Sequence, residues 1–218
     1  MAAGSSLRKI FCLEQVRESS YKINSMWSSH NARVAFGGHV VGLSVQACNE
    51  TIPKEQNLNV HSIHSCFLRG GIRSTPTYFT TKNTREGKNF VVRSVTVAQN
   101  EKEIFTMLAS YHNESKEKSH ILNFKPKMPK VRHHSKLENL RDIMDAMIPS
   151  GYKPNPIFDR PSYVKEFLDE FPSVQLKPTD PEKYIIPCDR KTNTLDCWVK
   201  VSENMGKFSF VSVQSTRG

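Results

Sequence analysis

The sequence predicts an α+β fold in which one buried helix is wrapped by an antiparallel sheet. Residues 40–48 read VVGLSVQAC, where nearly every residue is apolar or small, as in a helix covered on most of its surface. Several segments of strand character, separated by turn signals, follow within the first half of the chain. A chain of 218 residues is long enough to bury a core of this kind.

The buried helix is expected over residues 40–48, and the polar stretch from Asn49 to Pro53 should end it. Its small residues Gly42, Ser44 and Ala47 would let the helix approach the sheet closely. Ser44 fits packing better than nucleophilic catalysis, because the sequence GLSVQ lacks the second glycine of a nucleophile elbow and falls within the helix.

Four strands are expected after the helix, and the third is the most regular. Val91, Val95 and Val97 fall on one of its faces, and Ser94 and Thr96 fall on the other. The sequences REGKN and QNEKE on either side of it indicate tight reversals, so the last three strands should form an antiparallel meander. The expected strands are 60–68, 77–82, 90–98 and 104–112, and the reversals are 85–89 and 99–103.

The second half of the chain has a different character. Residues 116–136 hold seven Lys or Arg against one Glu, with two prolines and little periodicity, which indicates a basic linker. Phe124 is its one aromatic residue, so a base-stacking surface is not indicated. Short helices are expected at 137–148 and 162–171, with a proline-rich loop between them.

The composition bears on the partners of the protein, on its disulfides and metal sites, and on whether it spans a membrane. The formal net charge of +10 favours anionic partners such as phosphorylated ligands, nucleic acid or acidic surfaces. An odd number of cysteines without a CxxC pair argues against a disulfide framework and a structural zinc. No window approaches the roughly 20 apolar residues of a membrane span, so we expect a soluble intracellular protein. The cysteines are Cys12, Cys48, Cys66, Cys188 and Cys197.

Three stretches carry a resemblance to a known family. They are FGGHVVG (36–42), HSIHSCFLRGG (61–71) and TREGKNFVVRSVTVAQNEKEIF (84–105). In this order and spacing they resemble the N-terminal half of the type II acyl-coenzyme A thioesterases, which include bacterial thioesterase II and the peroxisomal acyl-CoA thioesterase of animals. The resemblance covers about residues 7–113 and resumes near 194–201.

The resemblance implies a hotdog fold, a long central helix wrapped by an antiparallel sheet, and the family has two of them in one chain. We therefore expect an N-terminal acyl-CoA thioesterase hotdog domain, a basic, proline-containing linker with short helices, and a fragment of a second hotdog with a divergent tail. The expected ranges are 1–114, 115–192 and 193–218. The implied activity is hydrolysis of fatty acyl-CoA to free fatty acid and coenzyme A, with no cofactor.

The resemblance also implies that this chain is catalytically incomplete. In the family an Asp, a Thr or Ser, and a Gln orient the attacking water, and all three lie in the second hotdog. Here NTLDCWVKVSENMG (193–206) resembles the strand that opens that domain, and the tail KFSFVSVQSTRG follows it. We therefore assign no catalytic residue. The alternative function is a non-catalytic hotdog module that binds acyl-CoA or a partner protein.

Gly37, Gly38, His39 and Arg69 are the candidate substrate-binding residues. Helix-start amides at the two glycines could receive a carbonyl or phosphate oxygen, or the glycines could serve a sharp turn into the helix. His39 stands where the family usually has Gln; a helix N-terminus should bias it towards neutral, and a partly exposed polar residue is the simpler interpretation. Arg69 either faces a coenzyme A phosphate or is a solvated strand-end residue.

Other polar residues of the first half are interpreted as structural. His61 and Tyr111 or His112 correspond loosely to positions that face the active site in the second hotdog, as does Asn49 or Glu50, but these positions do not act in the family. His61 and His64 lie three apart in a strand and point to opposite faces, so no metal site is expected. The basic linker could attract coenzyme A phosphates or nucleic acid, although a solvated connector is the simpler interpretation.

Fatty acyl-CoA is the expected partner, and no nucleic acid or membrane span is expected. A first hotdog without its second half would expose an edge strand and an apolar face, so we expect a homo-oligomer through the exposed sheet, or aggregation. The resemblance implies a peroxisomal protein. The terminal Thr216, Arg217 and Gly218 are not a Ser-Lys-Leu type signal, so a cytosolic protein is expected if this C-terminus is native.

Overall fold

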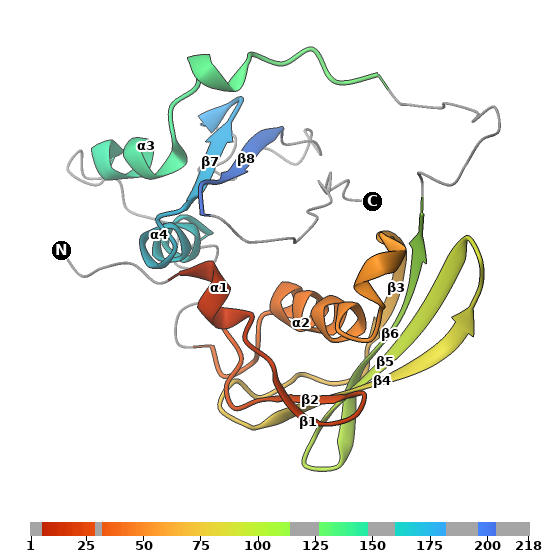
Figure 1. The fold of residues 1–218 in the computed structure, drawn as a ribbon. Coiled ribbons are helices and arrows are strands. Elements are labelled where there is room, and N and C mark those ends of the chain that lie inside the picture. Colours follow the sequence, from red (N-terminus) through yellow and green to blue (C-terminus); the bar gives the residue numbers. More distant parts are fainter. Residues whose placement is uncertain (1–5, 29–31, 114–126, 148–159, 182–195, 204–218) are drawn as a thin grey trace. The chain divides into compact units, whose positions relative to one another are not determined.

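The computed structural model describes residues 6–28, 32–113, 127–147, 160–181 and 196–203. The chain divides into two compact units, Arg8–Leu122 and a second unit made of Met1–Leu7 with Asn123–Gly218. Figure 1 shows the elements of both units. The C-terminal tail, Phe124, Cys188 and most of the proline-rich loop lie outside the described residues.

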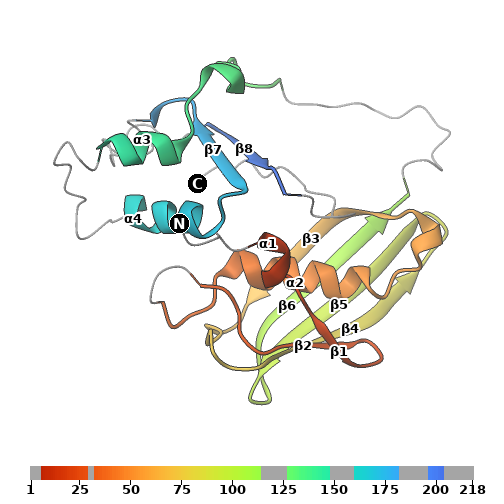
Figure 2. The ribbon, with the colours of Figure 1, turned by 60° about the vertical axis from the view of Figure 1, so that its left-hand side comes forward.

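The first unit is one long helix packed on one face of a six-stranded antiparallel sheet (Figures 1 and 2). The strand order is β1-β2-β4-β5-β6-β3, so β1 and β3 are the two edges. The elements are α1 (Leu7–Ile10), β1 (Glu14–Arg17), β2 (Ser20–Ile23), α2 (Gly37–Asn49), the 3₁₀ turn η1 (Lys54–Gln56), β3 (Asn59–Phe67), β4 (Thr77–Glu86), β5 (Phe90–Gln99) and β6 (Lys102–His112). This is the predicted α+β fold with a helix wrapped by an antiparallel sheet.

The meander β4-β5-β6 forms as the sequence predicts. Gln99 pairs with Lys102 across a two-residue turn, and its central residues Asn100 and Glu101 have φ of 48° and 63°. Two positive φ angles are the geometry of a type I′ hairpin turn, whose twist matches that of the flanking strands. The other reversal is shorter than predicted, because β4 continues through Arg85 and Glu86.

The core lies between α2 and the inner face of the sheet. Val40, Leu43 and Ala47 of the helix are buried, as are Phe79 and Phe105 of the sheet. Ser44 is also fully buried, and its Oγ donates to the Val40 carbonyl oxygen at 2.8 Å, so it is a packing residue as expected. Gly42 serves a different neighbour from the one expected, because a Cβ there would lie 2.5 Å from Cε1 of Phe11, outside the sheet.

The second unit has a core of its own. It contains the 3₁₀ turn η3 (His134–Lys136), α3 (Leu140–Met147), α4 (Arg160–Glu170) and an antiparallel pair, β7 (Val174–Pro178) with β8 (Cys197–Val201). Both predicted helices form, with shifted ends, whereas β7 lies in a stretch expected to be linker. The buried residues are Leu137, Leu140, Met144, Leu168, Phe171 and Val174.

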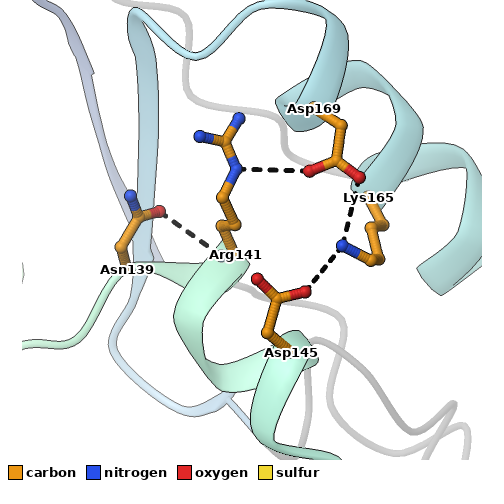
Figure 3. A network of polar contacts seen from close by, with 5 residues as sticks. All are labelled: Asn139, Arg141, Asp145, Lys165 and Asp169. Atoms are coloured by element: carbon orange, nitrogen blue, oxygen red, sulfur yellow. Dashed lines mark hydrogen bonds and ion pairs between the residues drawn. The ribbon is translucent and has the colours of Figure 1, made fainter. Parts of the chain in front are cut away.

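Ion pairs join α3 to α4 on the surface of this core (Figure 3). Lys165 Nζ lies 2.6 Å from Asp145 Oδ1 and 3.1 Å from Asp169 Oδ2, and Arg141 Nε lies 3.4 Å from the other oxygen of Asp169. The carboxylates are about half exposed, so this network orients the two helices more than it stabilises them.

Candidate functional site

The first turn of α2 presents backbone donors to its surroundings. Phe36 is the N-cap residue, and its carbonyl oxygen accepts from the amides of His39 at 3.0 Å and Val40 at 3.2 Å. The amides of Gly37 and Gly38 have no hydrogen-bond acceptor among the described residues. Free amides at a helix start carry partial positive charge, so they can receive an oxyanion or a polarised carbonyl oxygen.

Close packing explains why both positions are glycine. A Cβ on Gly38 would lie 2.6 Å from Cε1 of Phe36, and a Cβ on Gly37 would lie 3.1 Å from Cζ of Phe67. Neither glycine has the left-handed φ that would require glycine for a turn. The two glycines therefore let aromatic rings lie directly against the helix start.

Exposed apolar side chains surround this helix start. Phe67 is 55% exposed and Phe36 is 52% exposed, although both lie against the glycines. Val34, two residues before Phe36, forms a β-bridge with Ile72, and both are more than two fifths exposed. We call Val34, Phe36, Phe67 and Ile72 the apolar rim. Exposed apolar side chains beside free helix-start amides could receive the apolar part of a ligand.

Gln99 holds the loop that carries one side of the apolar rim. Its Oε1 accepts from the Ile72 amide at 2.8 Å, and its Nε2 donates to the Ile72 carbonyl oxygen at 2.8 Å and to Thr77 Oγ1 at 2.8 Å. Because the Gln99 side chain is buried and its amide is bonded on both sides, the position of Ile72 is fixed from the sheet.

His39 is buried, so the expectation of a partly exposed residue is wrong. Its Nδ1 accepts from the Trp27 amide at 2.8 Å, its Nε2 donates to the Ile10 carbonyl oxygen at 2.6 Å, and its ring contacts Phe11 edge to face. Burial lowers the pKa of His39, and the bond to Ile10 opposes this in part. The neutral state follows the expectation, but the main cause is desolvation. Both ring nitrogens are engaged by the protein itself.

Arg69 lies just beyond the end of β3. Its Nη1 donates to the Glu103 carbonyl oxygen at 2.6 Å, and its amide donates to the Ile104 carbonyl oxygen. The exposed side chain thus ties the end of β3 to the start of β6, which is a structural use of the guanidinium. Whether it also receives a phosphate remains a prediction.

The other polar candidates lie away from the glycines. Glu50 caps the opposite end of α2. His61 is exposed at a bulge in β3, with Nδ1 3.0 Å from Ser110 Oγ, and His112 stacks on Phe90. Tyr111 is buried, which raises the pKa of its hydroxyl. Within the described ranges, no three His, Cys, Asp or Glu side chains form a metal-binding group.

A buried polar cluster at the end of α2 was not predicted from the sequence. Arg93 lies on the inner face of β5 and is fully buried. Its Nη2 is 2.6 Å from Glu86 Oε1, and its Nε donates to Thr51 Oγ1 at 3.0 Å. The signal was present in the sequence, since Arg93 interrupts the inward-facing valines at 91, 95 and 97.

Comparisons with known proteins agree on one family. Residues 24–112 match the family model "Acyl-CoA thioesterase N-terminal domain". The chain is 33% identical over 99 residues to acyl-coenzyme A thioesterase 8 of Rattus norvegicus, a match covering 45% of this chain and 30% of that protein. It is 25% identical over 210 residues to peroxisomal acyl-coenzyme A thioester hydrolase 1 of Saccharomyces cerevisiae, covering 91% of this chain and 59% of that protein. The chain thus spans less than two thirds of the length of these relatives.

The fold is also similar to that of a solved acyl-CoA thioesterase structure. The crystal structure of acyl-CoA thioesterase II TesB2 from Mycobacterium marinum superposes with a TM-score of 0.60 at 24% identity, covering 91% of this chain and 61% of that one. No helix of the described segments is both long and apolar enough to cross a membrane. The described first unit has the hotdog fold, and its residues 24–112 match the acyl-CoA thioesterase N-terminal domain family.

Proposed function

We propose that this chain acts on fatty acyl-CoA, in the reaction that hydrolyses the thioester to a free fatty acid and coenzyme A. One observation supports this most directly: the amides of Gly37 and Gly38 are free among the described residues and lie within the apolar rim. A thioester carbonyl oxygen needs such donors when it becomes an oxyanion, and an acyl chain needs an apolar surface beside them. The names of the relatives above point to the same substrate class.

A second candidate function, binding without hydrolysis, is favoured by the state of His39. It is the titratable side chain nearest in sequence to the two glycines, and both of its ring nitrogens are hydrogen-bonded to backbone groups. A histidine held in this way cannot take a proton from water without losing the Trp27 bond. The resemblance, moreover, implies that the catalytic groups belong to a second hotdog domain.

Thiol release from palmitoyl-CoA and calorimetric binding to the purified chain test both functions together. We expect binding that Gly38→Ala weakens by about tenfold, because an added methyl group displaces the Phe36 ring and hinders one hydrogen bond worth ~1–1.5 kcal/mol. Gly42→Ala is the matched control, since it also places a Cβ against an aromatic ring but lies beyond the first turn. Its binding should match the wild type.

The outcomes separate the two functions. Turnover that Gly38→Ala reduces, with Gly42→Ala unaffected, supports hydrolysis at this helix start. Binding without turnover supports the module. Neither binding nor turnover, in a chain shown to be folded by circular dichroism, would overturn both.

For the cellular location we propose the peroxisome, and for the assembly a homo-oligomer through the first sheet. The yeast relative is named as a peroxisomal acyl-coenzyme A thioester hydrolase, which supports the first proposal. Co-localisation of the untagged chain with a peroxisomal marker by immunofluorescence is the expected result, and a uniformly cytosolic signal would contradict it.

A further inference from the structure

One face of the β7–β8 pair gathers positive charge. In the antiparallel register Gln175 lies opposite Lys200 and Lys177 lies opposite Trp198. Directly opposed residues share a face, and residues two apart on a strand share it as well. These four side chains therefore lie on the same face of the pair, while buried Val174 lies on the other face, towards the core. The pair is drawn in blue in Figures 1 and 2.

The chain before η3 runs across this face and is held there. Trp198 Nε1 donates to the Arg132 carbonyl oxygen at 3.1 Å, and Lys177 Nζ donates to the His134 carbonyl oxygen at 3.3 Å. The His134 ring lies 5.6 Å from the Trp198 ring. The Arg132 side chain donates to the Thr179 carbonyl oxygen at 3.1 Å. The basic stretch thus has a defined place in the second unit: residues 132–136 are exposed to solvent, and hydrogen bonds and ring contacts hold them to β7 and β8.

Six cations belong to this surface and its adjoining segment, which we call the basic face. No Asp or Glu occurs in 127–137, in β7 or in β8. Within the described part of the chain, none of the six makes an ion pair, in contrast to the compensated charges of α3 and α4. The six are Lys127, Lys130, Arg132, Lys136, Lys177 and Lys200.

The pKa of His134 reflects the same excess of positive charge. Its pKa is lowered, first by desolvation and then by the charges of His133, Lys177 and Lys200. These side chains come from the linker, from β7 and from β8, so three segments bring positive charge to the surroundings of His134. A region where cations lower the pKa of a neighbouring histidine is one that an anion would stabilise.

We propose that the basic face binds the anionic headgroups of a lipid surface. Lys127, Lys130 and Lys200 are exposed, and Met128, between two of these lysines, is 64% exposed. An apolar side chain flanked by lysines can enter the headgroup region while the cations meet the phosphates, each worth ~1 kcal/mol near the surface. The face suits nucleic acid less well, because the Trp198 indole N–H already donates to the Arg132 carbonyl oxygen. The His133 and His134 rings also lie against each other, with their centroids 4.1 Å apart, and not open to a base.

Co-sedimentation of the full 218-residue chain with large vesicles tests this proposal. The vesicles contain 30% phosphatidylserine in phosphatidylcholine, and pure phosphatidylcholine vesicles are the reference. We expect binding to the anionic vesicles alone and its loss as NaCl is raised. The triple variant Lys127→Glu, Lys130→Glu, Lys200→Glu should bind about 100-fold more weakly, from ~1 kcal/mol for each lysine.

A charge-matched variant makes the test specific. Lys82→Glu, Lys88→Glu, Lys102→Glu changes the net charge equally at exposed positions of the first unit, and its binding should stay within a few fold of the wild type. Met128→Ser should weaken the binding at low salt, because it removes the apolar contact with the headgroup region. Equal loss in both triple variants would overturn the proposal, because it would show that total charge suffices. Tighter binding to a 20-nucleotide RNA than to the vesicles, abolished by the first triple variant, would also overturn it in favour of nucleic acid.

Discussion

At the scale of the single residue, His39 shows how a side chain at a suggestive position acquires another role. It occupies the third residue of α2, yet it points to the Trp27 amide and the Ile10 carbonyl oxygen and not to a ligand. Because a backbone N–H can donate only to an unprotonated nitrogen, the Trp27 bond requires neutral His39. The residue therefore joins two N-terminal segments to the helix start, and it does so in one protonation state.

This role predicts a dependence of stability on pH. Burial lowers the folded-state pKa of His39, so the unfolded chain binds a proton first, near its ordinary pKa of about 6.5. The free energy of unfolding should therefore fall as pH drops below about 6.5, until the folded-state pKa is reached, by at most ~1.4 kcal/mol per pH unit, and should be insensitive to this group above it. Urea unfolding at pH 7.5 and 5.5 measures the change.

The matched variants are His39→Gln, which keeps a donor and an acceptor without a titrating ring, and His64→Gln, which removes an exposed histidine of β3. The first should lose roughly 1 kcal/mol less than the wild type between the two pH values, and the second should behave as the wild type does. Identical slopes for His39→Gln and wild type would show that the ring does not titrate as its burial requires.

Some helices and strands could be predicted from the sequence and others could not, and the reasons are physical. Val91, Val95 and Val97 fall on one face of β5 with polar residues opposite, and α2 is apolar on most sides, so local pattern alone identified both. The strands β1, β2 and β7 are four or five residues long and carry charged or polar side chains. Their pairing, not their pattern, makes them strands, which sequence reasoning cannot see.

The candidate site also has features that the sequence shows and features that it does not show. The pair Gly37 and Gly38 was visible in the sequence because it precedes an apolar helix, but its packing against Phe36 and Phe67 was not. Phe67 reaches the helix from a strand some 30 residues later in the chain. Likewise, His39 was expected to be partly exposed because the Ile10 carbonyl oxygen that covers it comes from a distant segment.

The Arg93 cluster joins the end of α2 to β4 and β5, and it predicts a strong coupling between two substitutions. Glu86 is half exposed, whereas the Arg93 side chain is 1% exposed. Glu86→Gln should cost about 1–2 kcal/mol, because it leaves a buried cation without its counter-charge. In an Arg93→Met background the same change should be nearly neutral, since Glu86 stays hydrated. A double-mutant cycle by urea unfolding gives the coupling.

The exposed neighbour Arg85 supplies the control for that cycle. Arg85→Met removes the same charge from the same region, and surface substitutions usually change stability by less than 0.5 kcal/mol. Additive effects of Glu86→Gln and Arg93→Met would mean that the ion pair contributes nothing beyond its parts. In that case the cluster would be a packing feature alone.

For the molecule as a whole, β3 has no strand partner on one side among the described residues, and this edge suggests how copies of the chain associate. β3 pairs with β6 on one side and ends the six-stranded sheet on the other. Ile63 and Phe67, two residues of this strand, are exposed and apolar. An edge strand with unsatisfied backbone groups and apolar side chains favours pairing with another strand, and a second copy brings an identical one.

We therefore expect light scattering of the wild-type chain at micromolar concentration to give a mass above the 24.9 kDa of one chain. Ile63→Lys should shift the population towards the monomer, because a two-fold contact would bring two added positive charges together at the edge. Thr80→Lys adds the same charge at an exposed position of the inner strand β4 and should leave the mass unchanged. A wild-type chain that scatters as a monodisperse monomer would contradict the proposed assembly, and equal effects of both lysines would place the contact elsewhere.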